Sequence, residues 1–355
     1  MWGRRFRLPI PEAGPADGVT LNNMIKALAS LTLFSLYSGF AQPAPAPKPL
    51  FRDPIYDGAA DPSLIYNPAT RKWLMFYTNR RASEPNLPAV TWLHGTRIGI
   101  AESADGGNTW TYDGTVQLDY GKPDYTHWAP ELFAHRGVFH MYLSVVPGIF
   151  RDWNAPRQIV HFTSRDLRKW KFESALDLGS DRVIDACVIQ LPDGKFRMWF
   201  KDESAKDGSL HYADSPDLYH WTAKGVAIPG VNGEGPKAFK WKGQYWLIAD
   251  VWKGLAVFRS TDCLKWERQP DNILTEPGTL PTDRAQGNHA DIVVSAGRAY
   301  IFYFTHQRGA DAQGKDPDWN KRTVIQVAEL KEAGAIITCD RNQPVHVALR
   351  PPTRP

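Results

Sequence analysis

The chain has 355 residues, of which 43% are hydrophobic and 12% aromatic, with 14 tryptophans, so it can bury a large core. The formal net charge of +4 is small for this length. Because no basic run or aromatic platform of the nucleic-acid-binding kind is present, we expect no nucleic-acid partner.

The first 50 residues differ in character from the rest. Residues 1–23 are interpreted as an upstream extension ahead of a start at Met24. Residues 24–42 combine a lysine, an apolar stretch and small residues, which is typical of a secretory signal peptide with cleavage near Ala41–Gln42. The alternative, a membrane anchor helix, needs a longer apolar run to span a bilayer.

Export has consequences for localisation and for the segment that follows. We expect a secreted or periplasmic protein that does not contact the membrane after signal cleavage. Residues 43–50 (PAPAPKPL) are predicted to be a Pro-rich linker. The three cysteines are odd in number and far apart, so no disulfide framework is expected: Cys187, Cys263 and Cys339.

Five stretches after residue 50 repeat one pattern, a short strand, a turn with Gly, Asn or Pro, and an apolar, aromatic strand. They are 61–77, 129–143, 185–200, 234–248 and 289–303. In four units a further strand leads into a Ser–Asp–Trp motif, whose Ser and Asp can close a turn while Trp fills the gap between units. The motifs are Ser103–Asp105–Trp110, Ser164–Asp166–Trp170, Ser215–Asp217–Trp221 and Ser260–Asp262–Trp266. The fifth unit has the strand, at 323–330, without the motif.

Each unit therefore supplies four antiparallel strands in roughly 50 to 60 residues, the signature of a propeller blade. The sequence predicts an all-β fold, a five-bladed β-propeller with four antiparallel strands per blade. The predicted domain spans 51–345, and 346–355 form a C-terminal tail. We expect a monomer or a weak dimer.

The first residues of the five stretches begin the innermost strands, so they should meet at one mouth of the central channel. They are Asp61, Ala129, Asp185, Glu234 and His289. Neighbouring carboxyls suit glycosidic bond cleavage, in which one protonated carboxyl protonates the leaving oxygen and another carboxylate activates water or attacks the sugar. Asp61, Asp185 and Glu234 are thus predicted to be catalytic, the alternative being that they only cap strands.

Several of these segments resemble glycoside hydrolase family 43. His127-Trp128-Ala129-Pro130-Glu131-Leu132 resembles its blade-two segment, Asp61-Pro62-Ser63 its blade-one segment with the general base, and Glu234-Gly235-Pro236 its blade-four segment with the general acid. Asp185 falls where the family has an acidic residue that orients and tunes the acid. His289 matches a blade-five histidine that sits over a calcium ion or a water cluster.

The resemblance covers residues 50 to 340 and implies an exo-acting, inverting hydrolase of plant, algal or microbial polysaccharide. It implies no required cofactor and leaves two occupants for the channel axis beside His289: a structural calcium ion or water. Family 117, the neoagarobiose hydrolases, has a similar layout and implies His289 as the acid instead. A non-catalytic carbohydrate-binding propeller is the alternative from another class.

The loops that leave the second strand of each unit are expected to surround the pocket. The predicted substrate-binding residues come from these loops and from the inner strands: Arg80, His127, Trp128, Glu131, Lys201, Trp252, His289, His306 and Arg308. Trp92 and Trp153 are further candidates for stacking on sugars. Arg80, Lys201 or Arg308 would bind a carboxylate or sulfate and so predict an anionic carbohydrate, against the alternative of ordinary surface charge.

Overall fold

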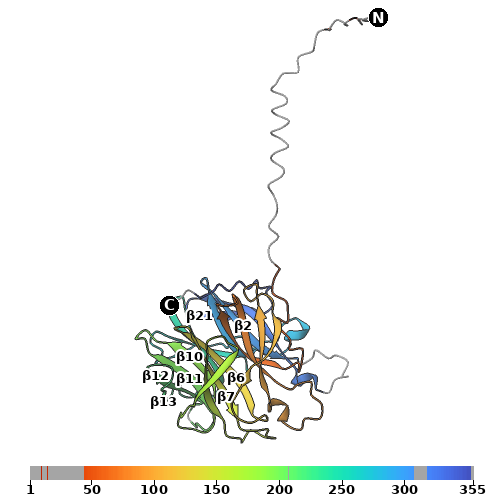
Figure 1. The fold of residues 1–355 in the computed structure, drawn as a ribbon. Coiled ribbons are helices and arrows are strands. Elements are labelled where there is room, and N and C mark those ends of the chain that lie inside the picture. The colour runs from red at the N-terminus through yellow and green to blue at the C-terminus, as the bar shows by residue number, and fades with distance from the viewer. Residues whose placement is uncertain (1–8, 10–13, 15–43, 207, 308–317, 353–355) are drawn as a thin grey trace, which may run out of the picture. The chain divides into compact units, whose positions relative to one another are not determined.

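The computed structural model describes residues 9, 14, 44–206, 208–307 and 318–352. The chain divides into two units, 1–43 and 44–355, and the second holds every strand described below (Figure 1). The predicted signal peptide at 24–42 lies outside the described residues. Within the described ranges, no helix has the length and apolar character needed to cross a membrane.

Five sheets, each built from consecutive strands, form the five blades of a propeller (Figure 1). Blade 1 comprises β1 (Ala59–Asn67), β2 (Lys72–Asn79), β3 (Arg97–Ser103) and β4 (Thr111–Thr115). Blade 2 comprises β6 (Thr126–His135), β7 (Val138–Val146), β8 (Gln158–Ser164) and β9 (Lys169–Ala175), with β5 (Gln117–Leu118) added in parallel to β9. Blade 3 comprises β10 (Val183–Gln190), β11 (Phe196–Asp202), β12 (Leu210–Ser215) and β13 (Thr222–Val226).

Blade 4 comprises β14 (Glu234–Trp241), β15 (Gln244–Asp250), β16 (Leu255–Ser260) and β17 (Glu267–Arg268). Blade 5 comprises β18 (Asn288–Ser295), β19 (Arg298–His306), β20 (Thr323–Ala333) and β21 (Ile336–Cys339). Short 3-10 turns lie at η1 (Thr91–Leu93), η2 (Pro281–Asp283) and η3 (Trp319–Lys321). The prediction of five blades with four antiparallel strands each is confirmed.

The Ser–Asp–Trp motifs close the turns between the third and fourth strands, as predicted. In blade 2 the Ser164 hydroxyl accepts the Leu167 amide at 2.9 Å, and Asp166 accepts the Lys169 amide at 2.8 Å. The same bonds recur in blades 3 and 4. Trp170 is buried between blades 1 and 2, with its ring 6.0 Å from that of Phe76. These motifs are therefore structural.

The inner strands of blades 1 to 4 bulge at the same position, where one residue has a left-handed backbone. These residues are Asp61 (φ 50°), Ala129 (φ 43°), Asp185 (φ 61°) and Gly235 (φ 54°). Glu234 precedes its bulge and pairs with Asp250 across the sheet. The sequence-based alignment of Glu234 with Asp61 and Asp185 was therefore wrong by one residue.

A ring of side chains fastens the blades at the centre of the propeller. Two residues after the bulge position, each inner strand places a side chain on the axis: Ser63, Glu131, Cys187, Lys237 and Asp291. Four of these accept the backbone amide that follows the ring residue of the next blade. The bonds are Leu132 to Ser63 (3.2 Å), Val188 to Glu131 (2.9 Å), Ala238 to the Cys187 sulfur (3.1 Å) and Leu64 to Asp291 (2.6 Å).

Lys237 is the exception in this ring because an ammonium cannot accept a hydrogen bond. Its Nζ instead lies 2.7 Å from Glu131 Oε2 and 2.9 Å from Asp291 Oδ1. Burial alone would lower the pKa of Lys237, but the carboxylates of Asp291 and Glu131 outweigh it and hold that pKa well above its ordinary value. Burial raises the pKa of Glu131. The axis thus carries one cation between two buried carboxyl groups.

Terminal segments complete the contact between blades 1 and 5. Phe51 and Ile325 exchange two backbone hydrogen bonds, of 3.1 and 2.9 Å, and the Ala46 amide donates to Val345 at 2.7 Å. Leu50 and Val347 are buried in the same core cluster. Part of the segment expected as linker (43–50) and part of the expected tail (346–355) therefore pack with the domain predicted at 51–345.

Replacing Lys237 with Met should leave Glu131 and Asp291 facing each other without a cation. Because breaking a buried ion pair costs about 3–5 kcal/mol, we expect the free energy of unfolding in urea at pH 7 to fall by this amount. Lys72→Met is the control, since it breaks the more exposed pair with Glu102 and should cost at most about 1 kcal/mol.

Two further outcomes bear on this interpretation. Equal losses from Lys237→Met and Lys72→Met would contradict a special role for the axial cation. If Lys237→Met does not fold, adding Glu131→Gln and Asp291→Asn should restore folding, because neither amide needs a counter-charge and both keep an acceptor oxygen for the ring.

Candidate active site

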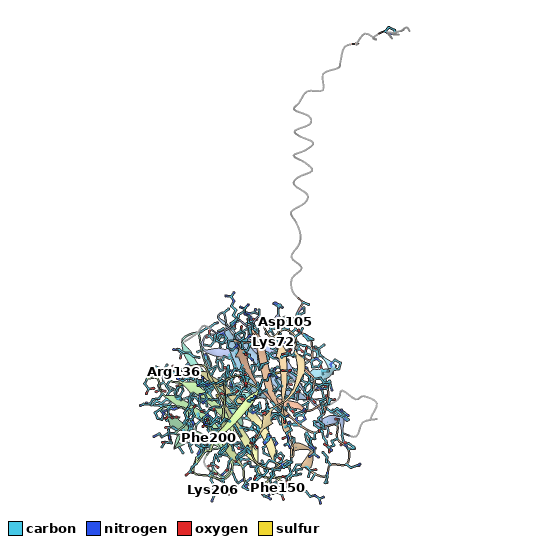
Figure 2. All side chains as sticks on the ribbon, viewed as in Figure 1. Lys72, Asp105, Arg136, Phe150, Phe200 and Lys206 are labelled. Carbon is cyan, nitrogen blue, oxygen red and sulfur yellow. The ribbon has the colours of Figure 1, made fainter. Side chains whose placement is uncertain are left out.

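One pocket, with a volume of about 240 Å³, gathers the polar residues at the start of the inner strands. Asp61, Asp185, Glu234 and His289 all line it. Loops after the second strands approach the same end of the domain: in Figure 2, Phe150 and Lys206 lie at the end opposite Lys72 and Asp105. The other side chains lining the pocket include Arg80, Trp92, Trp128, Trp153, Arg157, Glu203, Asp250, Trp252 and His306.

Asp61 sits at the bulge of β1 between two nitrogen-bearing side chains. Its Oδ1 lies 3.4 Å from an Arg80 guanidinium nitrogen and 3.5 Å from His289 Nδ1. The Arg80 guanidinium also lies over the Phe304 ring, 4.4 Å from its centroid. Left-handed backbone is uncommon for residues other than glycine, and such strain concentrates at functional sites. The strained bulge thus holds this carboxylate inside the pocket.

Asp185 is the most buried carboxyl of the predicted catalytic three. Its Oδ2 accepts the Gly235 amide at 3.0 Å, and its own amide donates to Ser144 at 2.9 Å. Burial raises the pKa of Asp185 to about 7, and the charges of Glu234 and Asp61 act in the same direction, against His289. The pocket therefore holds a carboxyl that exchanges its proton near neutral pH.

Glu234 is more open to solvent, with its side chain 30% exposed, and it is paired with a cation. Lys201 Nζ lies 2.9 Å from Glu234 Oε2 and 4.8 Å from the centroid of the Trp252 ring. In the structure Asp185 carries a raised pKa, because Asp185 is deeply buried and has no cation as close as Lys201 is to Glu234.

Asp250 is a pocket carboxyl that the sequence analysis did not single out. It ends β15 opposite Glu234, accepts the Trp252 amide at 2.8 Å through Oδ1, and accepts the His289 amide at 3.1 Å through Oδ2. Burial and the Glu234 charge raise the pKa of Asp250 to about 6. It positions two pocket residues from different blades. Its place at the end of the strand paired with Glu234 was the signal available in the sequence.

A second missed group lies on the blade 2 and 3 side of the pocket. The buried Arg157 places Nε 2.6 Å from Glu203 Oε2, its guanidinium lies over the Trp128 ring, and it donates to the Trp153 carbonyl. Lys201 lies 3.6 Å from Glu203 Oε1. Arg157 thus supports the aromatic wall of the pocket, and it follows a loop whose length concealed its position.

Three of the predicted substrate-binding residues do not line the pocket. Lys201 is buried beside it and contacts Glu234. Glu131 is buried on the axis, where Lys237 and the Val188 amide occupy its two oxygens. His127 is buried in β6 and does not line the pocket, and burial lowers its pKa to about 4. The bulge at Ala129 explains the difference, because it turns Trp128 toward the pocket and Glu131 along the axis. Arg308 lies outside the described residues.

The resemblance noted above implies calcium or water on the axis, and the residues present allow a test of fit. Calcium takes about six to eight oxygen ligands. The carboxylates that converge on this axis, Glu131 and Asp291, already enclose the Lys237 ammonium. In the part of the chain that the structure describes, no group of three or more His, Cys, Asp or Glu is arranged to hold a metal ion. The axial residues therefore do not fit a calcium ion between these carboxylates.

Three solved structures with similar folds are glycoside hydrolases. A thermostable family-43 glycoside hydrolase is 17% identical, with a TM-score of 0.60, over 85% of this chain and 100% of that one. A β-xylosidase/α-arabinofuranosidase from a compost microbial metagenome, in complex with xylotriose, is 18% identical with a TM-score of 0.61, over 82% and 96%. A β-1,3-galactosidase is 15% identical with a TM-score of 0.58, over 83% and 97%.

Sequence comparison gives the family directly. Among curated protein sequences, none matches this chain. The profile of the glycosyl hydrolases of family 43, however, matches residues 51–336, which covers four blades and the first three strands of the fifth. Together with the five-bladed fold, this match shows that the chain belongs to glycosyl hydrolase family 43 and is a glycoside hydrolase.

Proposed function

We propose that the protein is an inverting hydrolase that releases a neutral sugar from the end of an oligosaccharide or polysaccharide chain. The observation that carries the proposal is the meeting of three carboxyl groups, of Asp61, Asp185 and Glu234, in one pocket with aromatic walls. Inverting glycosidases need a general acid and a general base on opposite sides of the scissile bond. The three carboxyls come from three different blades, so they approach the pocket from different directions.

Glu234 is assigned as the general acid and Asp61 as the general base. Asp61 would take a proton from a water molecule as that water attacks the anomeric carbon. Glu234 would give a proton to the glycosidic oxygen as the bond between that oxygen and the anomeric carbon breaks. The products are a sugar of inverted anomeric configuration and the shortened chain, and the acid regains the proton that the base gained.

Asp185 is assigned the storage of the catalytic proton in the free enzyme. Its raised pKa, about 7, means that below neutral pH it is protonated while burial disfavours its charged form. The Asp185 Oδ2 accepts the Gly235 amide, which links this carboxyl to the residue next to Glu234.

The charges in the pocket favour a neutral sugar over the anionic one expected from the sequence. Arg80 lies against Asp61, Lys201 against Glu234, and Arg157 against Glu203. Among the described residues that line the pocket, five carboxyls face two arginines. A substrate carboxylate or sulfate would have to compete with these carboxylates for its cation.

The size of the pocket supports action at a chain end. At about 240 Å³ it is smaller than the pockets of roughly 300–1,000 Å³ that hold drug-sized ligands. Trp128 and Trp153 form one wall, with ring centroids 6.2 Å apart. A pocket of this size suits a single terminal sugar ring lying against an aromatic wall.

We also propose that Lys237 supplies the positive charge on the axis, in place of a calcium ion.

His289 is the alternative acid within the same proposal. Its Nδ1 lies 3.5 Å from Asp61 Oδ1 and 4.0 Å from Asp185 Oδ2, so a proton on this nitrogen would face two carboxylates. The family 117 resemblance assigns the acid to this histidine. The variants described next distinguish the two assignments.

Glu234→Gln should lose about 10²–10⁴-fold in kcat/KM on an oligosaccharide, the range for a general acid. The loss should be much smaller on p-nitrophenyl glycosides, whose leaving group needs little protonation. Asp61→Asn should fail on both. The substrates are aryl glycosides and oligosaccharides of xylose, arabinose and galactose, with the product anomer read by NMR. If His289→Ala abolished activity while Glu234→Gln kept the wild-type rate, the acid would be His289.

Activity should depend on the proton held by Asp185. Because that proton leaves as pH rises through about 7, the value for Asp185, kcat/KM on an oligosaccharide should fall about tenfold per pH unit above it. Asp185→Asn removes a negative charge and should move this limb to lower pH. Asp250→Asn is the control, since the pKa of Asp250 is about 6. A limb near 7 that moved only in Asp250→Asn would assign it to Asp250.

We also propose export, which is supported by the composition of residues 24–42 alone. Protein recovered from the periplasm or medium of an expressing cell should begin at Gln42 when sequenced from its N-terminus. Ala41→Leu should block processing because signal cleavage needs a small residue at this position. An unprocessed protein that stays in the cytosol would contradict the proposal.

A further inference from the structure

A second hollow adjoins the active-site pocket between blades 4 and 5. It has a volume of about 480 Å³ and is lined by Trp252, Thr275, Pro277, Arg284, Ala285, Gln286, Asn288 and His306. Three of these, Trp252, Asn288 and His306, also line the active-site pocket. The two hollows are therefore contiguous, and Trp252 forms part of the wall of both. We call the second one the blade 4–5 groove.

The groove lies on the side of the pocket that holds the proposed acid. Lys201 Nζ contacts Glu234 Oε2 at 2.9 Å and lies over the Trp252 ring at 4.8 Å, so Glu234 and Trp252 are linked through one ammonium group. A general acid protonates the oxygen of the leaving group, so the departing part of the substrate lies on the acid's side of the scissile bond. The groove begins where that part of the substrate would emerge.

The lining of the groove has the chemistry of a sugar-binding surface. The Trp252 side chain is 43% exposed and can offer its apolar face to a sugar ring. The half-buried Gln286 amide and the exposed Arg284 guanidinium provide hydrogen-bonding groups for hydroxyls. The buried Asn288 amide donates to the carbonyls of Gln286 and Phe304 and so supports this wall. Apolar ring faces beside amide groups suit a neutral polyol better than an ion.

The position of Trp252 is fixed by the fold. Its backbone is left-handed (φ 58°), and its amide donates to Asp250 Oδ1 at 2.8 Å. The other Asp250 oxygen accepts the His289 amide at 3.1 Å. One buried carboxyl, that of Asp250, therefore fixes both Trp252 in the wall of the groove and His289 in the pocket. The two hollows are thus held in a fixed relative position.

We propose that the blade 4–5 groove binds the sugar units of the substrate on the leaving-group side of the scissile bond. The proposal rests on the function proposed above and names the part of the substrate that this chain recognises beyond the terminal sugar. It makes the enzyme selective for oligosaccharides with at least two sugars after the cleaved bond. Trp252 provides the stacking surface, and Arg284 and Gln286 bind the hydroxyl groups.

The test compares substrate length in two sets of variants. The substrates are a p-nitrophenyl monoglycoside and the di-, tri- and tetrasaccharides of the same sugar, starting with the xylose series. Trp252→Ala and the double variant Arg284→Ala/Gln286→Ala should lose 10-fold or more in kcat/KM on the tri- and tetrasaccharide relative to the monoglycoside. Trp153→Ala is the matched control, since this exposed tryptophan lines the pocket but not the groove.

Trp153→Ala should lower kcat/KM by the same factor for all lengths, because the terminal sugar is common to all the substrates. Equal losses on all lengths in the groove variants would overturn the groove proposal while leaving the proposed function intact. If the wild-type protein hydrolyses none of the xylose, arabinose or galactose substrates, the proposed function fails, and the groove proposal fails with it. Thermal melting of each variant separates a binding loss from a loss of folded protein.

Discussion

The fold depends on how the five inner strands can meet at one axis without leaving their backbone amides unsatisfied. Four inner strands turn an amide toward the neighbouring blade, and a buried amide without a partner is costly. Side chains of the preceding blade meet this need in four cases, with a hydroxyl, two carboxylates and a thiol as acceptors. Lys237 cannot accept, and it instead balances the charge that the two carboxylates bring.

The same constraint applies at the catalytic pocket, whose residues precede the ring residues along the inner strands. There, too, an amide at the start of an inner strand donates to a side chain of the preceding blade: Ala129 to Thr78, Asp185 to Ser144, Gly235 to Asp185 and His289 to Asp250. Two of these acceptors are pocket carboxyls with raised pKa values. Asp185 and Asp250 therefore both join blades and set the proton balance of the site.

The repeat pattern predicted the fold from sequence because it depends on local features. Alternating apolar residues, turn residues and the Ser–Asp–Trp spacing each specify a piece of a blade, and four such pieces recur. The residues at the pocket were found for the same reason, since strand starts meet in a propeller. The positions of Asp61, Asp185, Glu234 and His289 in one pocket agree with that prediction.

What the sequence did not reveal depends on contacts between blades. The one-residue offset of Glu234 follows from the bulge, whose visible marker is the proline after Asp61, Ala129 and Gly235. The roles of Glu131 and Lys237 depend on partners more than 50 residues away in the sequence. Glu131 and Lys237 themselves are 106 residues apart. The pairing of Lys201 with Glu234 was likewise not visible in the sequence, where Lys201 was expected to bind an anionic substrate.

The closing bond of the ring joins the first blade to the last. Leu64 donates to Asp291, 227 residues later, so the ring is incomplete until the last blade is in place. Closing so long a loop is slow, because its entropic cost precedes the favourable contacts between the strands that it joins. Until then Lys237 has Glu131 as its one carboxylate partner on the axis. Without the last blade, the apolar side chains that blade 1 packs against blade 5, such as Met75 against the cluster of Phe302, would stay exposed to solvent. The last blade thus both completes the ring and covers the apolar face of the first.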